Sequence, residues 1–131
     1  MSAPVAGGIV DGRLAPCPST PNCVCSDHGG EASVAPLGFT GNVDDAWRAA
    51  RAAIEATGGI VIRADASYLH ATYTTRVLRF VDDVELRLDA TARVIHVRSA
   101  SRVGRYDFGV NEKRVTRIAD AFSRLAPTAS G

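Results

Sequence analysis

Four stretches rich in β-branched and aromatic residues follow one another between residues 60 and 99, with only short links between them. Residues of these types favour β-strands. Links this short cannot hold the crossover that a parallel pair of strands needs, so neighbouring strands must run antiparallel. This succession constrains the fold more than any other feature, because it predicts a four-stranded, mainly antiparallel sheet. The predicted strands are residues 60–64, 68–75, 78–88 and 94–99.

Two amphipathic stretches flank the predicted strands. In residues 42–57 the apolar residues recur at helical spacing, Asn42 can cap the start, and a Gly-Gly pair follows the end. Residues 109–125 show the same spacing, and Pro127 prevents a long continuation. A helix, an antiparallel sheet and a second helix in this order predict an α+β fold with both helices packed on one face of the sheet.

The 131 residues of the chain fit a single domain. Residues 1–16 are mostly small and are interrupted by Gly and Pro. Residues 17–28 contain three cysteines and two prolines, and the prolines disfavour both a helix and a central strand. We therefore expect an irregular N-terminal arm (1–16), one α+β domain (17–126) that begins with an irregular Cys- and Pro-containing segment, and a C-terminal tail (127–131).

The net charge of +1 gives no overall reason to bind nucleic acid or an acidic membrane surface. No apolar stretch is long enough to span a bilayer, and the first residues lack the basic start and apolar core of a secretory signal. We expect a soluble, cytoplasmic protein, although a leader that had already been removed would leave no trace. Between Arg93 and Arg124, however, eight basic residues stand against three acids, which favours an acidic partner or ligand.

Asp82 is the first candidate for a functional site. Alternation along its strand places it on the apolar face with Val84 and Leu86. An isolated buried carboxylate is costly, so Asp82 needs a partner, and Arg98 or Arg102 is the natural one. Two interpretations follow: a structural ion pair that fixes the strand-to-loop geometry, or a polar pocket at the end of the sheet.

Residues 98–107 contain three arginines, two serines and a glycine just before the second predicted helix. Guanidinium groups bind carboxylates and phosphates with two parallel hydrogen bonds, and helix N-termini attract anions. In the structural alternative, the serines cap turns, Asp107 caps the helix, and the arginines pair with acids of the neighbouring strand. The candidate set for binding a ligand or partner is Asp82, Asp83, Glu85, Arg98, Ser99, Ser101, Arg102, Arg105 and Asn111.

Cys17 and Cys23 could form a disulfide or a reduced thiol pair, and the reduced pair is the default in the cytoplasm. With Cys25 and His28 they could instead form a Cys₃His zinc set, but the C-x₅-C and C-x-C spacings differ from the C-x-x-C of zinc sites. No signature of a catalytic triad, a phosphate-binding loop or paired carboxylates is present. We therefore predict no catalytic residue, no cofactor and no metal.

Three blocks of the sequence stand out, namely CPSTPNCV (17–24), RFVDDVELRLD (79–89) and HVRSASRVGRYDFGVN (96–111). In this order they resemble an uncharacterised bacterial and plastid family, domain of unknown function 1499. The chain departs from the family at Cys25, where serine is usual, and at Glu112, where arginine is usual. The resemblance implies that Cys17 and Cys23 are the paired cysteines and that the zinc set is not a family feature, and it supplies no reaction.

Taken together, these features predict a non-enzymatic accessory or binding module, or a subunit of a larger assembly. Its Arg/Ser/Asp cluster at the junction of sheet and helix would hold a protein partner or a small acidic ligand. The alternatives are a hydrolase, a thiol-dependent redox enzyme and a small anion-binding protein. Nucleic acid is not an expected partner. The prediction depends on the charged residues gathering at one place, with Asp82 near Arg102.

Overall fold

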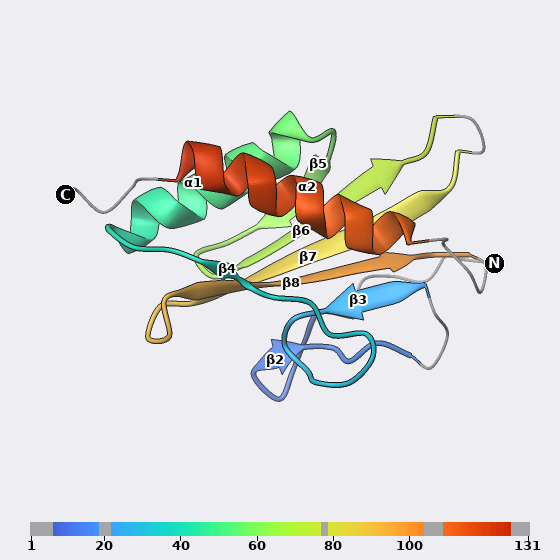
Figure 1. Cartoon of the computed structure of the whole chain (residues 1–131), viewed down its shortest axis with the longest axis horizontal. Coiled ribbons are helices and arrows are strands. Elements are labelled where there is room, and N and C mark those ends of the chain that lie inside the picture. The colour runs from blue at the N-terminus through green and yellow to red at the C-terminus, as the bar shows by residue number, and fades with distance from the viewer. Residues whose placement is uncertain (1–6, 19–21, 77–78, 104–108, 127–131) are drawn as a thin grey trace.

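The computed structural model describes residues 7–18, 22–76, 79–103 and 109–126 of the chain (Figure 1). The helices are α1 (Val43–Ala56) and α2 (Val110–Leu125). The strands are β1 (Ile9–Val10), β2 (Arg13–Leu14), β3 (Cys23–Cys25), β4 (Leu37–Gly38), β5 (Ile60–Ala64), β6 (Tyr68–Thr74), β7 (Val81–Asp89) and β8 (Val94–Ser101).

Within these residues, the main sheet is antiparallel and has the strand order β3-β8-β7-β6-β5, with β4 also paired to β8. The predicted α+β class and antiparallel sheet are confirmed, but the sheet has six strands rather than four. The additional strands, β3 and β4, pair with opposite ends of β8. Both are too short to show an alternating pattern, and β3 lies within the Cys- and Pro-containing segment that was predicted to be irregular.

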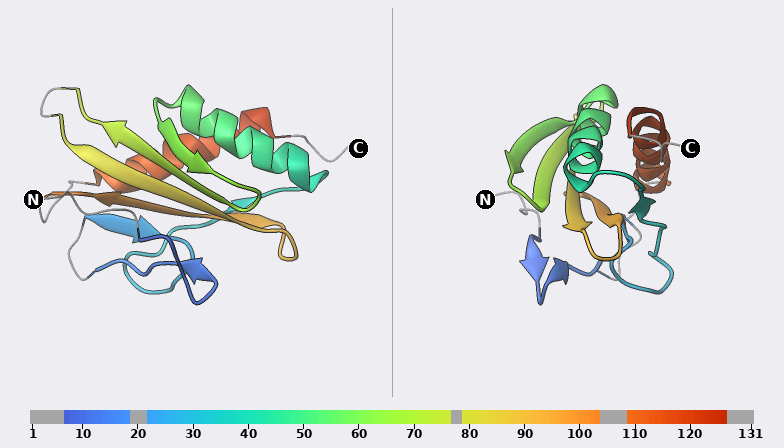
Figure 2. Two further views of the ribbon diagram at one scale, coloured as in Figure 1. Left: turned by 180° about the vertical axis from the view of Figure 1, so that it is seen from behind. Right: turned by 90° about the vertical axis from the view of Figure 1, so that its left-hand side faces the viewer.

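Both helices cover the same face of the sheet (Figures 1 and 2). Asn42 caps α1, because its side chain accepts a hydrogen bond from the Asp45 N–H at 3.0 Å. Gly109 precedes α2 with φ at +78°, a left-handed conformation that glycine adopts without steric cost. Neither helix, in the described part of the chain, is long and apolar enough to cross a membrane. The core between helices and sheet includes Ala50, Ile54, Val84, Leu86, Ile95, Val97, Ile118 and Phe122.

The opposite face of the sheet is covered by the described part of the N-terminal arm together with Cys17; from here on, "the arm" means residues 7–17 (Figure 2). Strands β1 and β2 form an antiparallel hairpin there, so this part of the chain is more regular than predicted. Leu14 of β2 is fully buried in a small second cluster with Cys25 and Tyr68. The two faces of the sheet therefore meet different environments: apolar helices on one side and the arm on the other.

Candidate functional site

The sheet divides the predicted binding residues between its two faces. Asp82 and Asp83 are neighbours in β7, so their side chains point in opposite directions. Arg105 lies outside the described residues. The helix side holds Asp82, Ser99, Ser101 and Asn111, and the arm side holds Asp83, Glu85, Arg98 and Arg102.

Asp82 pairs with Arg114 of α2, so the predicted partners Arg98 and Arg102 are wrong. The Arg114 Nη1 atom lies 2.6 Å from Asp82 Oδ2, and the two side chains are 6% and 3% exposed. The guanidinium group also lies 4.8 Å from the centroid of the Tyr73 ring. Arg98 and Arg102 cannot reach Asp82 because they bind acids on the other face. The sequence does hold a signal for Arg114, since it stands four residues before the core residue Ile118 and so shares its stripe of α2.

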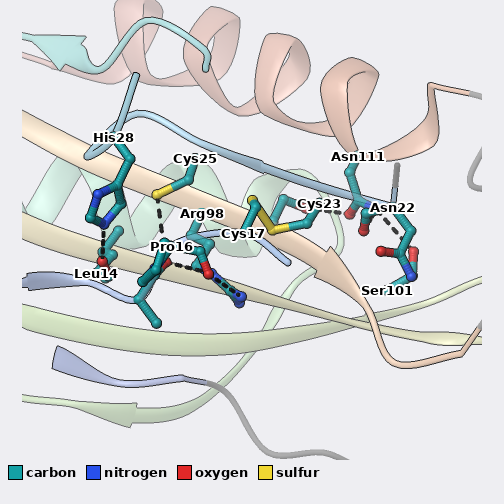
Figure 3. Close-up of a disulfide and its surroundings, with 12 residues drawn as sticks. Leu14, Pro16, Cys17, Asn22, Cys23, Cys25, His28, Arg98, Ser101 and Asn111 are labelled. Carbon is teal, nitrogen blue, oxygen red and sulfur yellow. Dashed lines mark hydrogen bonds between the residues drawn. A yellow bond between two sulfur atoms is a disulfide. The ribbon is translucent and has the colours of Figure 1, made fainter. Parts of the chain in front are cut away.

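Asn111 connects the other polar residues of the helix side. Ser99 Oγ donates to Asn111 Oδ1 at 2.6 Å, and Arg114 Nη1 donates to the same oxygen at 3.2 Å. Asn111 Nδ2 donates to Ser101 Oγ at 2.9 Å and to the Asn22 carbonyl at 3.1 Å (Figure 3). Ser99 and Asn111 are fully buried, and this network fastens the first turn of α2 to β8 and to Asn22, the residue before β3.

Glu85 is fully buried between the sheet and the arm. Its Oε2 atom accepts hydrogen bonds from the Tyr68 hydroxyl at 2.6 Å and from the Gly8 N–H at 2.8 Å. Its Oε1 atom lies 3.5 Å from Arg98 Nη1 but receives no hydrogen bond from the described residues. Burial and the hydrogen bond to Glu85 raise the pKa of Tyr68. Glu85 therefore holds the arm with one oxygen and leaves the other without a donor.

Asp83 binds the side chains of Arg102 and His70 on the arm side. Arg102 donates to both of its oxygens, at 2.9 and 3.0 Å, and His70 Nε2 lies 2.7 Å from Oδ1. Burial raises the pKa of Asp83, but the hydrogen bonds from Arg102 and His70 outweigh burial and keep the pKa below its usual value. The ionised carboxylate is thus occupied by internal partners.

Asp27 is a further arm-side acid that the sequence did not predict. Arg87 binds both of its oxygens at 2.7 Å, the Leu14 N–H donates to Oδ2 at 2.9 Å, and His96 Nε2 lies 3.5 Å from Oδ1. Burial raises the pKa of Asp27, and the contacts with Arg87 and Leu14 lower it further than burial raises it. Alternation along β7 already places Arg87 on the same face as Glu85, but no local pattern connects it to an acid in an irregular loop.

A disulfide joins Cys17 at the end of the arm to Cys23 in β3, with the Cα atoms 5.6 Å apart (Figure 3). Cys25 is a buried free thiol, and burial raises its pKa. The ring of His28 donates from Nε2 to the Leu14 carbonyl at 2.7 Å. The members of the alternative zinc set thus have other partners, and the described part of the chain holds no group of three or more His, Cys, Asp or Glu side chains placed to bind a metal ion.

One end of the sheet combines the β6–β7 connection with the residues after β8. Thr74 pairs with Val81 across β6 and β7, and the Arg102 N–H donates to the Val81 carbonyl at 3.1 Å. The residues that follow β8 therefore lie beside the start of β7, where the chain enters from β6 (Figure 1). Sequence positions that are far apart contribute to one surface here.

This surface is basic and partly apolar. Arg76 and Arg79 are exposed, and neither forms an ion pair with a residue that the structure describes. Phe80, which follows Arg79, and Val103, which follows the Arg102 contact with Val81, are 46% and 52% exposed. We refer to Arg76, Arg79, Phe80 and Val103 as the basic end. Arg76 and Arg79 were not among the predicted site residues, because a loop gives no pattern that separates binding arginines from merely solvated ones.

Comparison with known families finds one family that matches most of the chain. The family described as "Protein of unknown function (DUF1499)" matches residues 13–122. The chain belongs to the DUF1499 family. The resemblance drawn from the three sequence blocks is therefore confirmed, and the DUF1499 match spans β2, the disulfide, the whole main sheet and most of α2. No curated protein matches the chain.

Proposed function

We propose that this DUF1499 chain is a non-enzymatic binding module, or a subunit of a larger assembly, and that it holds an acidic protein partner at the basic end. The observation that supports this proposal is that acidic side chains form ion pairs inside the molecule while two arginines are exposed at its surface. Asp82, Asp83 and Glu85 of β7 are buried and paired inside the molecule, whereas Arg76 and Arg79 are exposed without an acid among the described residues. Arginine beside an exposed aromatic residue is typical of protein interfaces.

The rival enzymatic functions have less support. A general acid or base must reach its substrate, but Asp82, Asp83 and Glu85 are each at most 4% exposed and already bind internal partners. A reactive cysteine needs a lowered pKa and access to solvent, whereas Cys25 is buried and its pKa is raised. A small anion-binding protein remains the second candidate, because the same guanidinium groups would bind phosphate.

A labelled peptide rich in Asp and Glu, with one Phe, tests the proposal by fluorescence anisotropy. We expect the wild-type chain to bind it and the Arg76→Glu/Arg79→Glu variant to bind roughly tenfold more weakly, a loss of about 1.4 kcal/mol. Binding should also weaken as salt is added, since exposed charges are screened. Arg48→Glu/Arg51→Glu is the matched control, because both of these arginines are exposed on α1, away from the basic end.

An equal loss of binding in both double variants would contradict the proposal, because it would show a response to net charge alone. Inorganic phosphate separates the two candidates. If millimolar phosphate displaces the peptide from the wild-type chain and binds by itself with the same dependence on Arg76 and Arg79, the small-anion function is correct.

The disulfide bears on where this binding takes place. Disulfides persist in oxidising compartments and are rare in the reducing cytoplasm. We infer that the protein works in an oxidising compartment, in contrast to the cytoplasmic location predicted from the sequence. Alkylation of free thiols in fresh cell extract, followed by mass spectrometry, should find Cys25 as the free thiol. Alkylated Cys17 and Cys23 would instead support the cytoplasm.

A further inference from the structure

The sheet face under the arm, together with the loop that follows β3, binds two N–H groups of the arm's main chain. Glu85 accepts a hydrogen bond from the Gly8 N–H at 2.8 Å, and Asp27 accepts one from the Leu14 N–H at 2.9 Å. Both carboxylates are buried in the domain beneath the arm. These contacts do not depend on which side chains the arm carries.

The same face also binds the arm's carbonyl groups. His28 donates to the Leu14 carbonyl at 2.7 Å, and Arg98 donates to the carbonyls of Ala15 at 2.9 Å and Pro16 at 3.4 Å (Figure 3). Acceptors for N–H groups and donors for carbonyl groups therefore lie along one face. This is the chemistry that recognises an extended peptide backbone.

One side chain of the arm is held as an anchor. Leu14 is fully buried against Cys25 and Tyr68, with Cys17 packed at the side. The neighbouring strand residues Ile9 and Val10 are each 46% exposed and add little. Main-chain contacts around one buried apolar anchor resemble a bound peptide more than a segment of the core.

The arm does not satisfy every group of the face that it covers. The Glu85 Oε1 atom is buried and receives no hydrogen bond from the described residues, although it lies 3.5 Å from Arg98 Nη1 in an ion pair. A buried acceptor without a hydrogen-bond donor is destabilising. A ligand that donates to Oε1 in addition would fit this face better than the arm does.

We propose that the sheet face beneath the arm is a groove for an extended segment of another protein, with a leucine followed by small residues, and that the arm is its occupant in cis. The Cys17–Cys23 disulfide fixes the end of the arm beside the groove. A tether this short gives an effective concentration on the order of millimolar. The arm of a second copy makes identical contacts without that advantage, so a partner with the additional hydrogen bond to Glu85 is favoured over a second copy.

The test uses the full-length chain with Leu14→Ala, which weakens the arm without altering the groove. The probe is a labelled synthetic peptide with the sequence of residues 7–16, GGIVDGRLAP. We expect it to bind the Leu14→Ala chain at least roughly tenfold more tightly than the wild-type chain, in which the intact arm competes. A control peptide with Ala in place of Leu should bind the same variant roughly tenfold more weakly.

Three results would overturn the inference. The first is no binding of the peptide to a Leu14→Ala chain that keeps the wild-type circular dichroism. The second is a stable dimer between wild-type and Leu14→Ala chains, which would assign the groove to a second copy. The third does not need the variant: if the amides of Gly8 and Leu14 exchange hydrogen as slowly as those of β7 in the wild-type chain, the arm never leaves the groove. The Arg76→Glu/Arg79→Glu variant should bind the arm peptide normally, so this test is independent of the basic end.

Discussion

Replacing Arg114 with methionine tests whether the buried ion pair with Asp82 holds α2 on the sheet. Methionine retains a long flexible stem but removes the charge. Asp82, with a side chain only 3% exposed, would then lose its 2.6 Å contact, and Tyr73 would lose the guanidinium above its ring. Removal of one partner from a buried pair costs about 3–5 kcal/mol, because an uncompensated charge stays behind.

The matched control lies on the same helix. Asp120 and Arg124 also form an ion pair, with atoms 3.0 Å apart, but their side chains are 64% and 71% exposed. Arg124→Met should therefore cost only about 0–1 kcal/mol. Urea unfolding followed by circular dichroism measures both variants, and equal m-values would show that the change is one of stability.

The double variant Asp82→Leu/Arg114→Met tests whether the charge left unpaired on Asp82 is what destabilises Arg114→Met. With both charges removed, no unpaired group remains, and the free energy of unfolding should return to near or above the wild-type value. If Arg114→Met costs no more than Arg124→Met, the buried ion pair does not hold α2 on the sheet. If the double variant is as unstable as Arg114→Met alone, the unpaired charge of Asp82 is not the cause of the loss.

Three further predictions concern the disulfide, a carboxylate and a glycine. Cys17→Ser/Cys23→Ser, which opens a loop with a sequence separation of 6, should lower the free energy of unfolding by about 2 kcal/mol, and a reductant should have the same effect on the wild-type chain but none on the variant. The pKa of Asp83 is lower in the folded chain than its unfolded value of about 3.9, so its contribution is present above that pH and is lost as the pH falls through the folded pKa. Asp83→Asn should therefore destabilise the chain at neutral pH and reduce its loss of stability on acidification, as urea midpoints across pH would show. Gly109→Ala should cost about 1–2 kcal/mol in thermal unfolding, because a Cβ there meets open space but the left-handed backbone is strained, while Gly29→Ala, without a positive φ, should cost much less.

The sequence predicts the faces of the strands better than the contacts across them. Alternation places Asp82 towards the helices and Asp83 and Glu85 on the opposite face, and the structure has this arrangement. The partner of Asp82 was wrong because it comes from a helix, and the rotation of α2 over the sheet is set by tertiary packing. Arg114 reaches Asp82 across 32 positions of sequence, which no local pattern encodes.

The arm shows where prediction from sequence reaches its limit. Small residues with Gly and Pro indicate irregular structure, and nothing in this composition says that Leu14 is a fully buried anchor. The charged face of β7 and β8 looks solvent-exposed from its alternation, because charged side chains are normally exposed. Part of it is buried because main-chain groups of the arm bind the carboxylate of Glu85 and the guanidinium group of Arg98, and those contacts appear only when the chain is folded.

The most direct test compares Arg102→Ala with Arg76→Ala, by measuring unfolding free energy and binding of the acidic peptide on each. Arg102 binds the buried carboxylate of Asp83, whereas Arg76 is exposed and forms no ion pair with a described residue. We predict that Arg102→Ala lowers stability by about 1–3 kcal/mol and leaves binding unchanged, and that Arg76→Ala weakens binding and leaves stability unchanged. If Arg102→Ala abolishes binding while Arg76→Ala has no effect on it, the interior charges carry the function and this account is wrong.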